Sequence, residues 1–218
     1  MRVVRPGLQA GDAQAVADEV LLRWMPRQLC RLLGDGDVDV RRVAAVVLGL
    51  VGDRTCVGCM ARALHDADEQ VHALAEHGLW SIWFRSGKAE AGAAFATGVG
   101  MLEREAYREA VGQFDAAAAL DPDFAEAHNQ CGMAHFFLGE WQESVEACER
   151  ALERMPAHFG AMAGMGHAYT QLERVEDALG CYRRALSINP RMPGIASAVE
   201  RLEAKLGDAP VLAAVRAI

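Results

Sequence analysis

The sequence predicts an all-α fold, a right-handed solenoid of stacked antiparallel helix pairs that continues as one superhelix. Three observations predict it: a helix-favouring composition, a period of 34 residues in the C-terminal half and a period of 31 residues in the N-terminal half. Alanine and straight-chain residues dominate the 218 residues, and only 7 are proline. These residues lose little conformational entropy in a helix, whereas proline breaks one.

The charge and apolar pattern of the chain narrow its classes of partner. The formal net charge is −8 at pH 7, and non-specific binding to phosphate needs a basic surface. We therefore expect no nucleic-acid partner. Charged residues interrupt every apolar run, so we also expect no membrane partner and a cytoplasmic location. In a reducing compartment the six cysteines should be free thiols.

Small residues and prolines recur every 34 residues in the C-terminal half. The sets in register are Gly98, Gly132 and Gly166; Ala110, Ser144 and Ala178; Ala117, Ala151 and Ala185; and Pro122, Pro156 and Pro190. Large residues stand at matched places between them, among them Phe114, Cys148 and Tyr182. Small residues let two helix axes approach closely, and proline ends the second helix because it lacks an N–H. The pattern therefore predicts three helical hairpins.

This pattern resembles the tetratricopeptide (TPR) repeat, whose glycine, alanine, aromatic and proline positions follow in the same order. The resemblance covers residues 89–192, with repeats at 91–124, 125–158 and 159–192. Glu105 and Glu173 depart from the family pattern at the position where the second repeat keeps Gly139. We expect these departures to be tolerated.

The chain continues beyond the third repeat. Residues 193–208 predict a capping helix with a polar outer face, which stacked repeats need at their end. After a break at Gly207 and Pro210, a tail over residues 209–218 places Leu212, Val215 and Ile218 on one helical stripe. Residues 210–218 are therefore a candidate for self-association, by docking into the groove of this molecule or a neighbour.

The N-terminal half has its own shorter period. Asp35 matches Asp66 and Asp37 matches Asp68 at a shift of 31 residues. Aspartates cap helix starts, and the residues after them open helices with an apolar stripe. The stretch "VRRVAAVVLGLVGD" (40–53) resembles a HEAT-like repeat. The resemblance implies that residues 1–88 hold HEAT-like helical repeats.

A short linker, "RSGKAE" (85–90), joins the two kinds of repeat. It has no glycine/serine run and cannot act as a flexible tether. Trp80 and Trp83 lie on one face of the helix before it and need burial. We therefore expect one continuous superhelix.

By its resemblance to TPR domains, the chain is expected to be a non-enzymatic scaffold that holds a partner peptide or helix along the wall formed by the first helix of each repeat. The resemblance places these residues on the wall: Phe95, Val99, Leu102, Asn129, Met133, Phe136, Phe137, His167 and Gln171. An apolar wall suits an amphipathic helix or a hydrophobic strand, and methionine adapts to varied ligands. Adjacent helical residues point about 100° apart, so Phe136 or Phe137 should be exposed.

Chaperone-binding members of the TPR family grip a terminal carboxylate with lysine, arginine and asparagine. The corresponding residues here are Phe95, Val99, Gln130, Gly160 and Gly164. The resemblance therefore does not extend to binding of an Hsp70 or Hsp90 tail.

The Cys56-x-x-Cys59 motif raises an alternative function. A thiol pair at a helix start can serve redox or zinc chemistry. A thioredoxin-type role needs a βαβ context, however, and His65, His72 and His77 match no zinc-ligand spacing. We keep a thiol- or zinc-dependent regulatory protein as the alternative.

Other chemistry is missing from the sequence. It contains no phosphate-binding loop, HExxH or nucleophile elbow, so we expect neither an enzyme nor a cofactor. HEAT-like lyases attach bilin chromophores, but nothing in this sequence marks a chromophore site.

Overall fold

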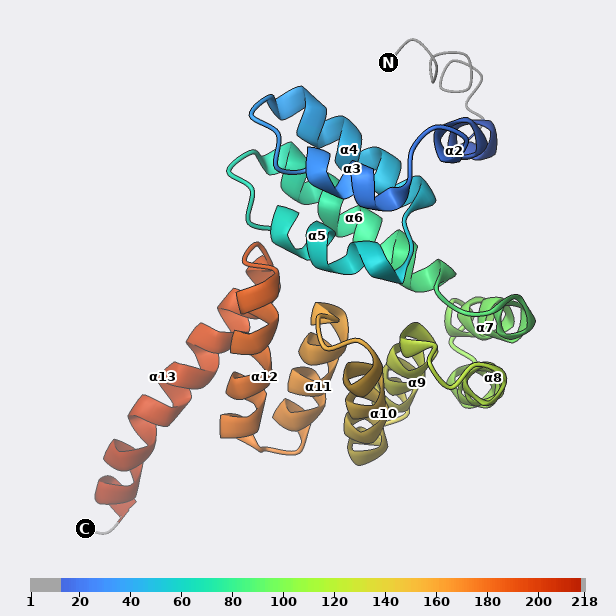
Figure 1. Cartoon of the computed structure of the whole chain (residues 1–218). Coiled ribbons are helices and arrows are strands. Elements are labelled where there is room, and N and C mark those ends of the chain that lie inside the picture. The colour runs from blue at the N-terminus through green and yellow to red at the C-terminus, as the bar shows by residue number, and fades with distance from the viewer. Residues whose placement is uncertain (1–12, 217–218) are drawn as a thin grey trace. The chain divides into compact units, whose positions relative to one another are not determined.

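The computed structural model describes residues 13–216, and side chains over residues 17–207. Across residues 13–216 the chain forms α-helices and one short 3₁₀-helix, without a strand. Helices adjacent in sequence pack together (Figure 1), so the all-α fold of stacked helix pairs is confirmed. None of the helices in this described range combines the length and apolarity needed to cross a membrane.

The chain forms two compact units, unit 1 (Met1–Gly87) and unit 2 (Lys88–Ile218). Unit 1 contains α2 (Ala13–Leu21), α3 (Pro26–Leu32), α4 (Val38–Val51), η1 (Arg54–Cys56), α5 (Val57–Ala63) and α6 (Glu69–Arg85). Unit 2 contains α7 (Ala89–Leu102), α8 (Tyr107–Leu120), α9 (Ala125–Phe137), α10 (Trp141–Arg154), α11 (Phe159–Gln171), α12 (Val175–Ile188) and α13 (Pro193–Arg216). That the two units continue one another as a single superhelix stays a prediction.

The aspartates related by the 31-residue period start the two long helices of unit 1. The Asp37 side chain accepts a hydrogen bond from the Asp39 N–H, and Asp68 accepts one from the Val71 N–H. A carboxylate at this position satisfies a backbone donor that the helix itself leaves unpaired. Helix α4 packs against α2, α3 and α6, and α5 packs against α6.

Two arginine–aspartate pairs tie α4 to the residues that precede α6. Arg41 donates to Asp66 through Nε at 2.7 Å and Nη2 at 3.1 Å. Arg42 donates to Asp68 through Nε at 3.0 Å and Nη2 at 2.6 Å. The hydrogen bond from Arg42 is the main reason that the pKa of Asp68 falls to about 2. Bidentate pairs of this kind fix orientation as well as distance, and here they hold α4 against the start of α6.

Cys30 on α3 and Cys59 on α5 form a disulfide, with Cα atoms 5.7 Å apart. The prediction of six free thiols is therefore wrong for these two residues. Stacking of the helices brings together two thiols that are 29 residues apart in sequence, at a Cα separation usual for a disulfide. The remaining cysteines, Cys56, Cys131, Cys148 and Cys181, are free and buried.

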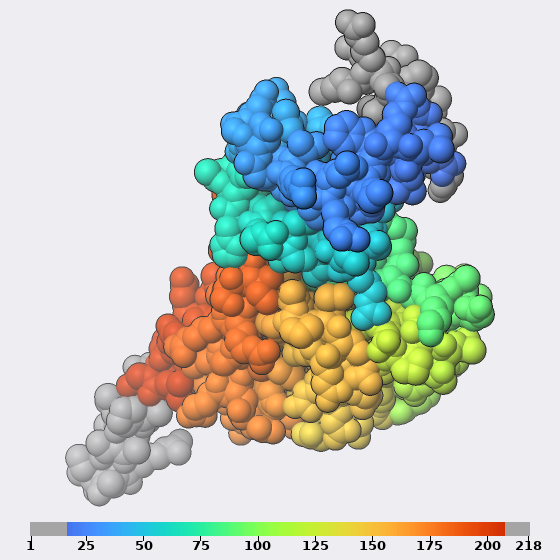
Figure 2. Space-filling model, viewed as in Figure 1, coloured from blue at the N-terminus to red at the C-terminus, as the bar shows by residue number. Residues whose placement is uncertain are grey.

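Unit 2 is a stack in which each helix packs against the next along the chain. Its hairpins appear as successive bands of colour in the space-filling view (Figure 2). The recurring glycines each lie against a side chain of the second helix, as the 34-residue pattern predicted. A Cβ on Gly98 would lie 2.7 Å from Phe114, one on Gly132 2.9 Å from the Cys148 Sγ, and one on Gly166 2.5 Å from Tyr182.

The residue that joins the two helices of each hairpin adopts a left-handed backbone. The φ angle is 75° at Gly139, 60° at Glu105 and 58° at Glu173. Glycine adopts this conformation without steric cost, whereas a residue with a Cβ loses about 1 kcal/mol or more there. The two glutamates are therefore tolerated at a measurable cost in stability.

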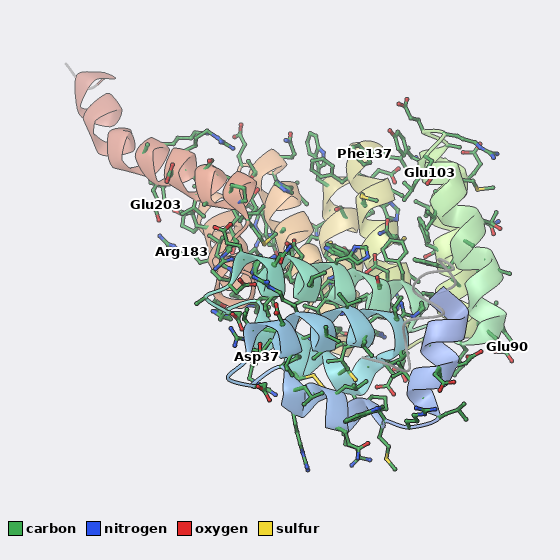
Figure 3. The ribbon with its side chains drawn as sticks, turned by 90° about the horizontal axis from the view of Figure 1, so that it is seen from above. Asp37, Glu90, Glu103, Phe137, Arg183 and Glu203 are labelled. Carbon is green, nitrogen blue, oxygen red and sulfur yellow. A yellow bond between two sulfur atoms is a disulfide. The ribbon has the colours of Figure 1, made fainter. Side chains whose placement is uncertain are left out.

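The sequence predicted a helix over residues 193–208, but α13 is longer and runs through Gly207 and Pro210 to Arg216. Ile195 and Ala198 are buried in its first part, and Glu203 pairs with Arg183 of α12 at 2.6 Å (Figure 3). The side chains of residues 208–218 lie outside the described part of the chain. Self-association through residues 210–218 therefore stays a prediction.

Candidate peptide-binding surface

The nine residues predicted for the wall are exposed, half-buried or buried. Toward the C-terminal ends of α9 and α11, Met133, Phe137, His167 and Gln171 are exposed. Phe137 is 54% exposed and Met133 is 41% exposed, and four residues separate them, so they lie about one helical turn apart. Three others are half-buried: Val99, Leu102 and Phe136.

Phe95 and Asn129 do not lie on an accessible wall, which corrects the sequence prediction. Phe95 is 5% exposed and packs between Phe114 and Phe124, with ring centroids 5.7 and 4.6 Å away. Asn129 is 9% exposed and donates its Nδ2 to Glu126. Phe95 is therefore buried among aromatic rings, and Asn129 is held by the buried Glu126 carboxylate.

Aromatic rings form a continuous row across the three hairpins of unit 2. The Tyr107 and Phe137 rings stack, with centroids 5.0 Å apart and planes inclined by 19°. Phe137 meets Phe136 edge to face at 5.9 Å, and Phe136 meets His167 at 6.4 Å. We call Tyr107, Met133, Phe136, Phe137 and His167 the aromatic face. In Figure 3, Phe137 projects from α9 on the same side as Glu103 at the end of α7.

The third hairpin contributes a polar group to this face. The Thr170 hydroxyl donates to the Gly166 carbonyl at 2.9 Å, so its only proton is used there. The Tyr182 hydroxyl lies 2.8 Å from the His167 Nδ1 and 3.3 Å from the Thr170 hydroxyl, and it can donate to either. Partial desolvation lowers the pKa of His167, so the imidazole is neutral at pH 7. His167 therefore adds the Nε2 of a neutral ring, as a donor or an acceptor, beside the aromatic rings.

An ion-pair cluster holds the second hairpin beside Phe137. Glu140 accepts from the Arg108 Nη2 at 2.5 Å and lies 2.7 Å from the His135 Nδ1. The hydrogen bond from Arg108, followed by that from His135, lowers the pKa of Glu140. Arg108 is on α8, His135 on α9 and Glu140 just before α10. The cluster therefore fixes the turn between α9 and α10 against α8 of the preceding hairpin.

A buried carboxylate lies at the other end of α9. Glu126 is fully buried, and its Oε1 accepts from Asn129 at 3.1 Å and from Gln130 at 2.6 Å. The His158 Nδ1 accepts from the Ala161 N–H, so its Nε2 donates to the Glu126 Oε2 at 2.7 Å. Three neutral donors satisfy the charge. This network occupies the region where chaperone-binding TPR domains are expected to carry cations.

The cysteine pair of the alternative function is not a free pair. Cys59 is bonded to Cys30, and Cys56 is a buried free thiol. In the part of the chain that the structure describes, no three His, Cys, Asp or Glu side chains gather into a group that could hold a metal ion.

Sequence reasoning missed the contribution of two tyrosines and of the buried network. Tyr107 stacks on Phe137 and Tyr182 contacts His167, and the 34-residue spacing indicates neither contact. The signal that could have identified Tyr182 is its hydroxyl, because a buried tyrosine needs a hydrogen-bond partner. Nothing in the periodicity pairs Glu126 with His158, since they belong to different helices.

Two curated proteins each resemble about half of the chain. A TPR repeat-containing protein of Rhizobium etli is 30% identical over 108 residues, which is 50% of this chain and 53% of that protein. The human Tetratricopeptide repeat protein 33 is 29% identical over 98 residues, which is 45% of this chain and 37% of that protein. The chain thus spans about half or less of the length of these relatives.

Solved structures of TPR domains share the fold of just over half of the chain. The first TPR of Spaghetti (RPAP3), bound to the HSP90 peptide SRMEEVD, matches with a TM-score of 0.53 at 19% identity, over 54% of this chain and 94% of that chain. The Arabidopsis OM64 TPR domain matches with a TM-score of 0.52 at 21% identity, over 53% and 96%. The Sgt2 TPR domain from Aspergillus fumigatus matches with a TM-score of 0.54 at 17% identity, over 57% and 83%.

The tetratricopeptide repeat family matches the chain at two successive places. One match covers residues 125–158 and the other covers residues 161–192. These ranges coincide with the hairpins α9–α10 and α11–α12. Residues 125–158 and 161–192 of this chain are tetratricopeptide repeats.

Proposed function

We propose that unit 2 is a protein-interaction module that binds a peptide segment of a partner protein on the aromatic face. The observation that carries the proposal is the exposure of Phe137, at 54%, in the middle of a row of rings that spans three hairpins. An aromatic side chain left exposed beside an exposed methionine is typical of a binding surface, because both bury large apolar area when a partner arrives.

The rest of the face supplies what a specific peptide site needs. Stacking on Tyr107 orients Phe137 before a ligand binds, which reduces the entropy cost of association. The His167 Nε2 adds one hydrogen-bonding group, a donor or an acceptor, among apolar groups. We propose residues 91–124 as a further TPR repeat, because Tyr107 belongs to it and extends the face. We also propose that residues 1–88 form HEAT-like repeats and that the protein is cytoplasmic.

The ligand that we propose differs from that of the peptide-bound structural relatives. The RPAP3 domain was solved with the acidic HSP90 peptide SRMEEVD. In this chain the corresponding region holds the buried Glu126 carboxylate and no lysine or arginine. A carboxylate would repel an acidic peptide tail, so the aromatic face is a better candidate than a carboxylate clamp.

A selection experiment tests the proposed function. The full chain is immobilised and used to select binders from a random 16-residue peptide library displayed on phage. Enriched peptides should bind wild-type protein and the Leu120→Asp variant equally, but bind the Phe137→Asp variant at least about tenfold more weakly, which is about 1.4 kcal/mol. Leu120 is a matched control because it is an exposed apolar residue, at 51%. Equal binding to all three proteins would refute the proposal.

A second candidate function is thiol-dependent regulation in unit 1, favoured by the Cys30–Cys59 disulfide. Glutathione disulfide would oxidise the two thiols to the disulfide and leave as two molecules of glutathione. Cys30 is the less buried partner and is the sulfur that an outside thiol reaches first. A reversible change in the melting temperature between oxidised and reduced glutathione, absent in Cys30→Ser, would support this function. A disulfide that glutathione cannot reduce in the folded protein would exclude it.

A further inference from the structure

We infer that the segment bound on the aromatic face is basic, with lysine or arginine beside an apolar anchor residue, and that Glu103 contacts its positive charge. The inference rests on the proposed function and specifies the chemistry of the partner. It follows from the charges that surround the aromatic face, taken together with the geometry of the rings.

The wall itself carries no cation. In the first repeat, five positions of α7 and its C-terminal flank belong to the wall: Gly92, Phe95, Val99, Leu102 and Glu103. The corresponding positions of the next two repeats lie 34 and 68 residues later. Neither lysine nor arginine occurs at any of these positions in the three repeats. The charged side chains among them are the carboxylates Glu103 and Glu126, and Glu126 is fully buried and satisfied by its neighbours. Glu103 is exposed.

The arginines near the hairpin ends are already engaged. Arg108 binds Glu140 at 2.5 Å, and Arg174 binds Asp177 at 2.8 Å while lying over the Tyr169 ring. Arg104 is exposed between two exposed glutamates, Glu103 and Glu105, which outnumber it. The surroundings of the face therefore carry a negative surplus, in a chain whose formal net charge is −8. Such a surplus attracts a basic partner over long range and repels an acidic one.

The rings add a short-range preference of the same sign. Glu103 is the residue that aligns with Phe137 in the preceding repeat, and both project on the same side of unit 2 (Figure 3). An ammonium or guanidinium group is attracted to the face of an aromatic ring and to a carboxylate at once. The exposed part of the Tyr107–Phe137 stack and the Glu103 carboxylate, on the same side of unit 2, offer both. Met133, one turn before Phe137, takes the apolar part of the same segment.

The composition of the selected peptides is the first test. Peptides from the phage selection that lose binding to Phe137→Asp should be enriched in lysine and arginine next to aromatic or aliphatic residues. Their affinity should fall as salt rises, because salt screens surface charges. A Phe137-dependent pool that is acidic or uncharged would overturn the inference and leave the proposed function intact. A pool of peptides that binds Phe137→Asp as tightly as wild type would refute both the inference and the proposed function.

A charge reversal on both partners is the second test. Glu103→Lys should lower the affinity for the most enriched peptide by about threefold to tenfold, the range expected when a charge at the rim of an interface is reversed in sign. The same peptide with its lysines replaced by glutamates should bind Glu103→Lys more tightly than it binds wild type. Glu149→Lys is the matched control, because Glu149 is an exposed glutamate of α10 outside the aligned wall positions. Equal effects of the two substitutions would mean that only net charge matters and that Glu103 makes no contact.

Discussion

The Tyr107 ring, at the start of α8, stacks on the Phe137 ring, at the end of α9, with centroids 5.0 Å apart. The contact joins two hairpins, yet more than half of Phe137 stays exposed. An aromatic pair contributes about 0.5–1.5 kcal/mol beyond the area it buries, and an exposed pair lies at the low end of that range. Phe137 therefore contributes little to stability and presents a large apolar surface to a partner.

Phe137→Asp should leave the fold almost unchanged while it removes peptide binding. We expect the helical circular dichroism to stay constant and the free energy of unfolding to fall by about 1 kcal/mol or less, because surface substitutions have small effects. Urea unfolding and a peptide-binding titration measure the two quantities on the same sample. Global unfolding of the variant would instead assign Phe137 to the core.

Gly166→Ala should destabilise unit 2, whereas Gly180→Ala should stabilise it. A Cβ on Gly166 would lie 2.5 Å from the Tyr182 ring, and overpacking of this kind costs about 1–3 kcal/mol. Gly180 is a helical glycine with nothing within 4 Å of its Cβ position, so alanine there gains about 0.5–1 kcal/mol of helix propensity. Thermal melting of the two variants compares them directly. Equal effects would show that Gly166 does not set the helix spacing.

Glu173→Gly should raise the stability of the protein, and Gly139→Ala should lower it. Both residues have a positive φ, 58° at Glu173 and 75° at Gly139. Removing the Cβ at Glu173 relieves about 1 kcal/mol of backbone strain, while adding one at Gly139 introduces a similar amount. The free energy of unfolding in urea should therefore move in opposite directions for the two variants. A loss of stability in Glu173→Gly would show that the glutamate side chain compensates its backbone.

The non-reduced, denatured protein should titrate with four free thiols, because Cys30 and Cys59 are joined. The Cys30→Ser variant should titrate with five, since it releases Cys59. In the native protein the reaction should be slow, because burial raises the pKa of Cys131 and Cys148 to about 12 and that of Cys181 to about 11. Six thiols in the wild-type protein purified without reductant would contradict the disulfide.

The Arg42–Asp68 pair should stabilise the protein above pH 4 and lose its effect in acid. The folded pKa of Asp68 is about 2, below its ordinary value of 3.8. A depressed carboxyl pKa contributes stability that is present above the unfolded pKa and is lost as the pH falls through the folded pKa. The stability difference between wild type and Arg42→Gln should therefore shrink between about pH 4 and pH 2.

Urea unfolding of both proteins across that pH range measures the difference. Arg62→Gln is the control, because Arg62 is an exposed arginine of the neighbouring helix α5 and is not part of the Arg42–Asp68 pair. Its effect should not change with pH. If the stability difference between wild type and Arg42→Gln stays constant down to pH 2, the Arg42–Asp68 pair does not contribute to the loss of stability in acid.

The periodic features of this protein could be read from the sequence because they depend on local or repeated physics. Asp37 and Asp68 start helices through their own side-chain hydrogen bonds. Gly132 and Gly166 face Cys148 and Tyr182 because a repeated hairpin needs room where the side chain of its second helix meets the first helix. These relations hold within one hairpin, so spacing along the chain is enough to predict them.

Tertiary packing alone decided which wall residues are accessible and which thiols are joined. Phe95 and Phe137 were both predicted for the wall, but Phe114 and Phe124 bury Phe95, whereas Phe137 has one stacked neighbour and stays open. Cys30 meets Cys59 only because α3 and α5 are brought together. Burial and bonding depend on atoms from other helices, and the order of residues within one helix does not contain their positions.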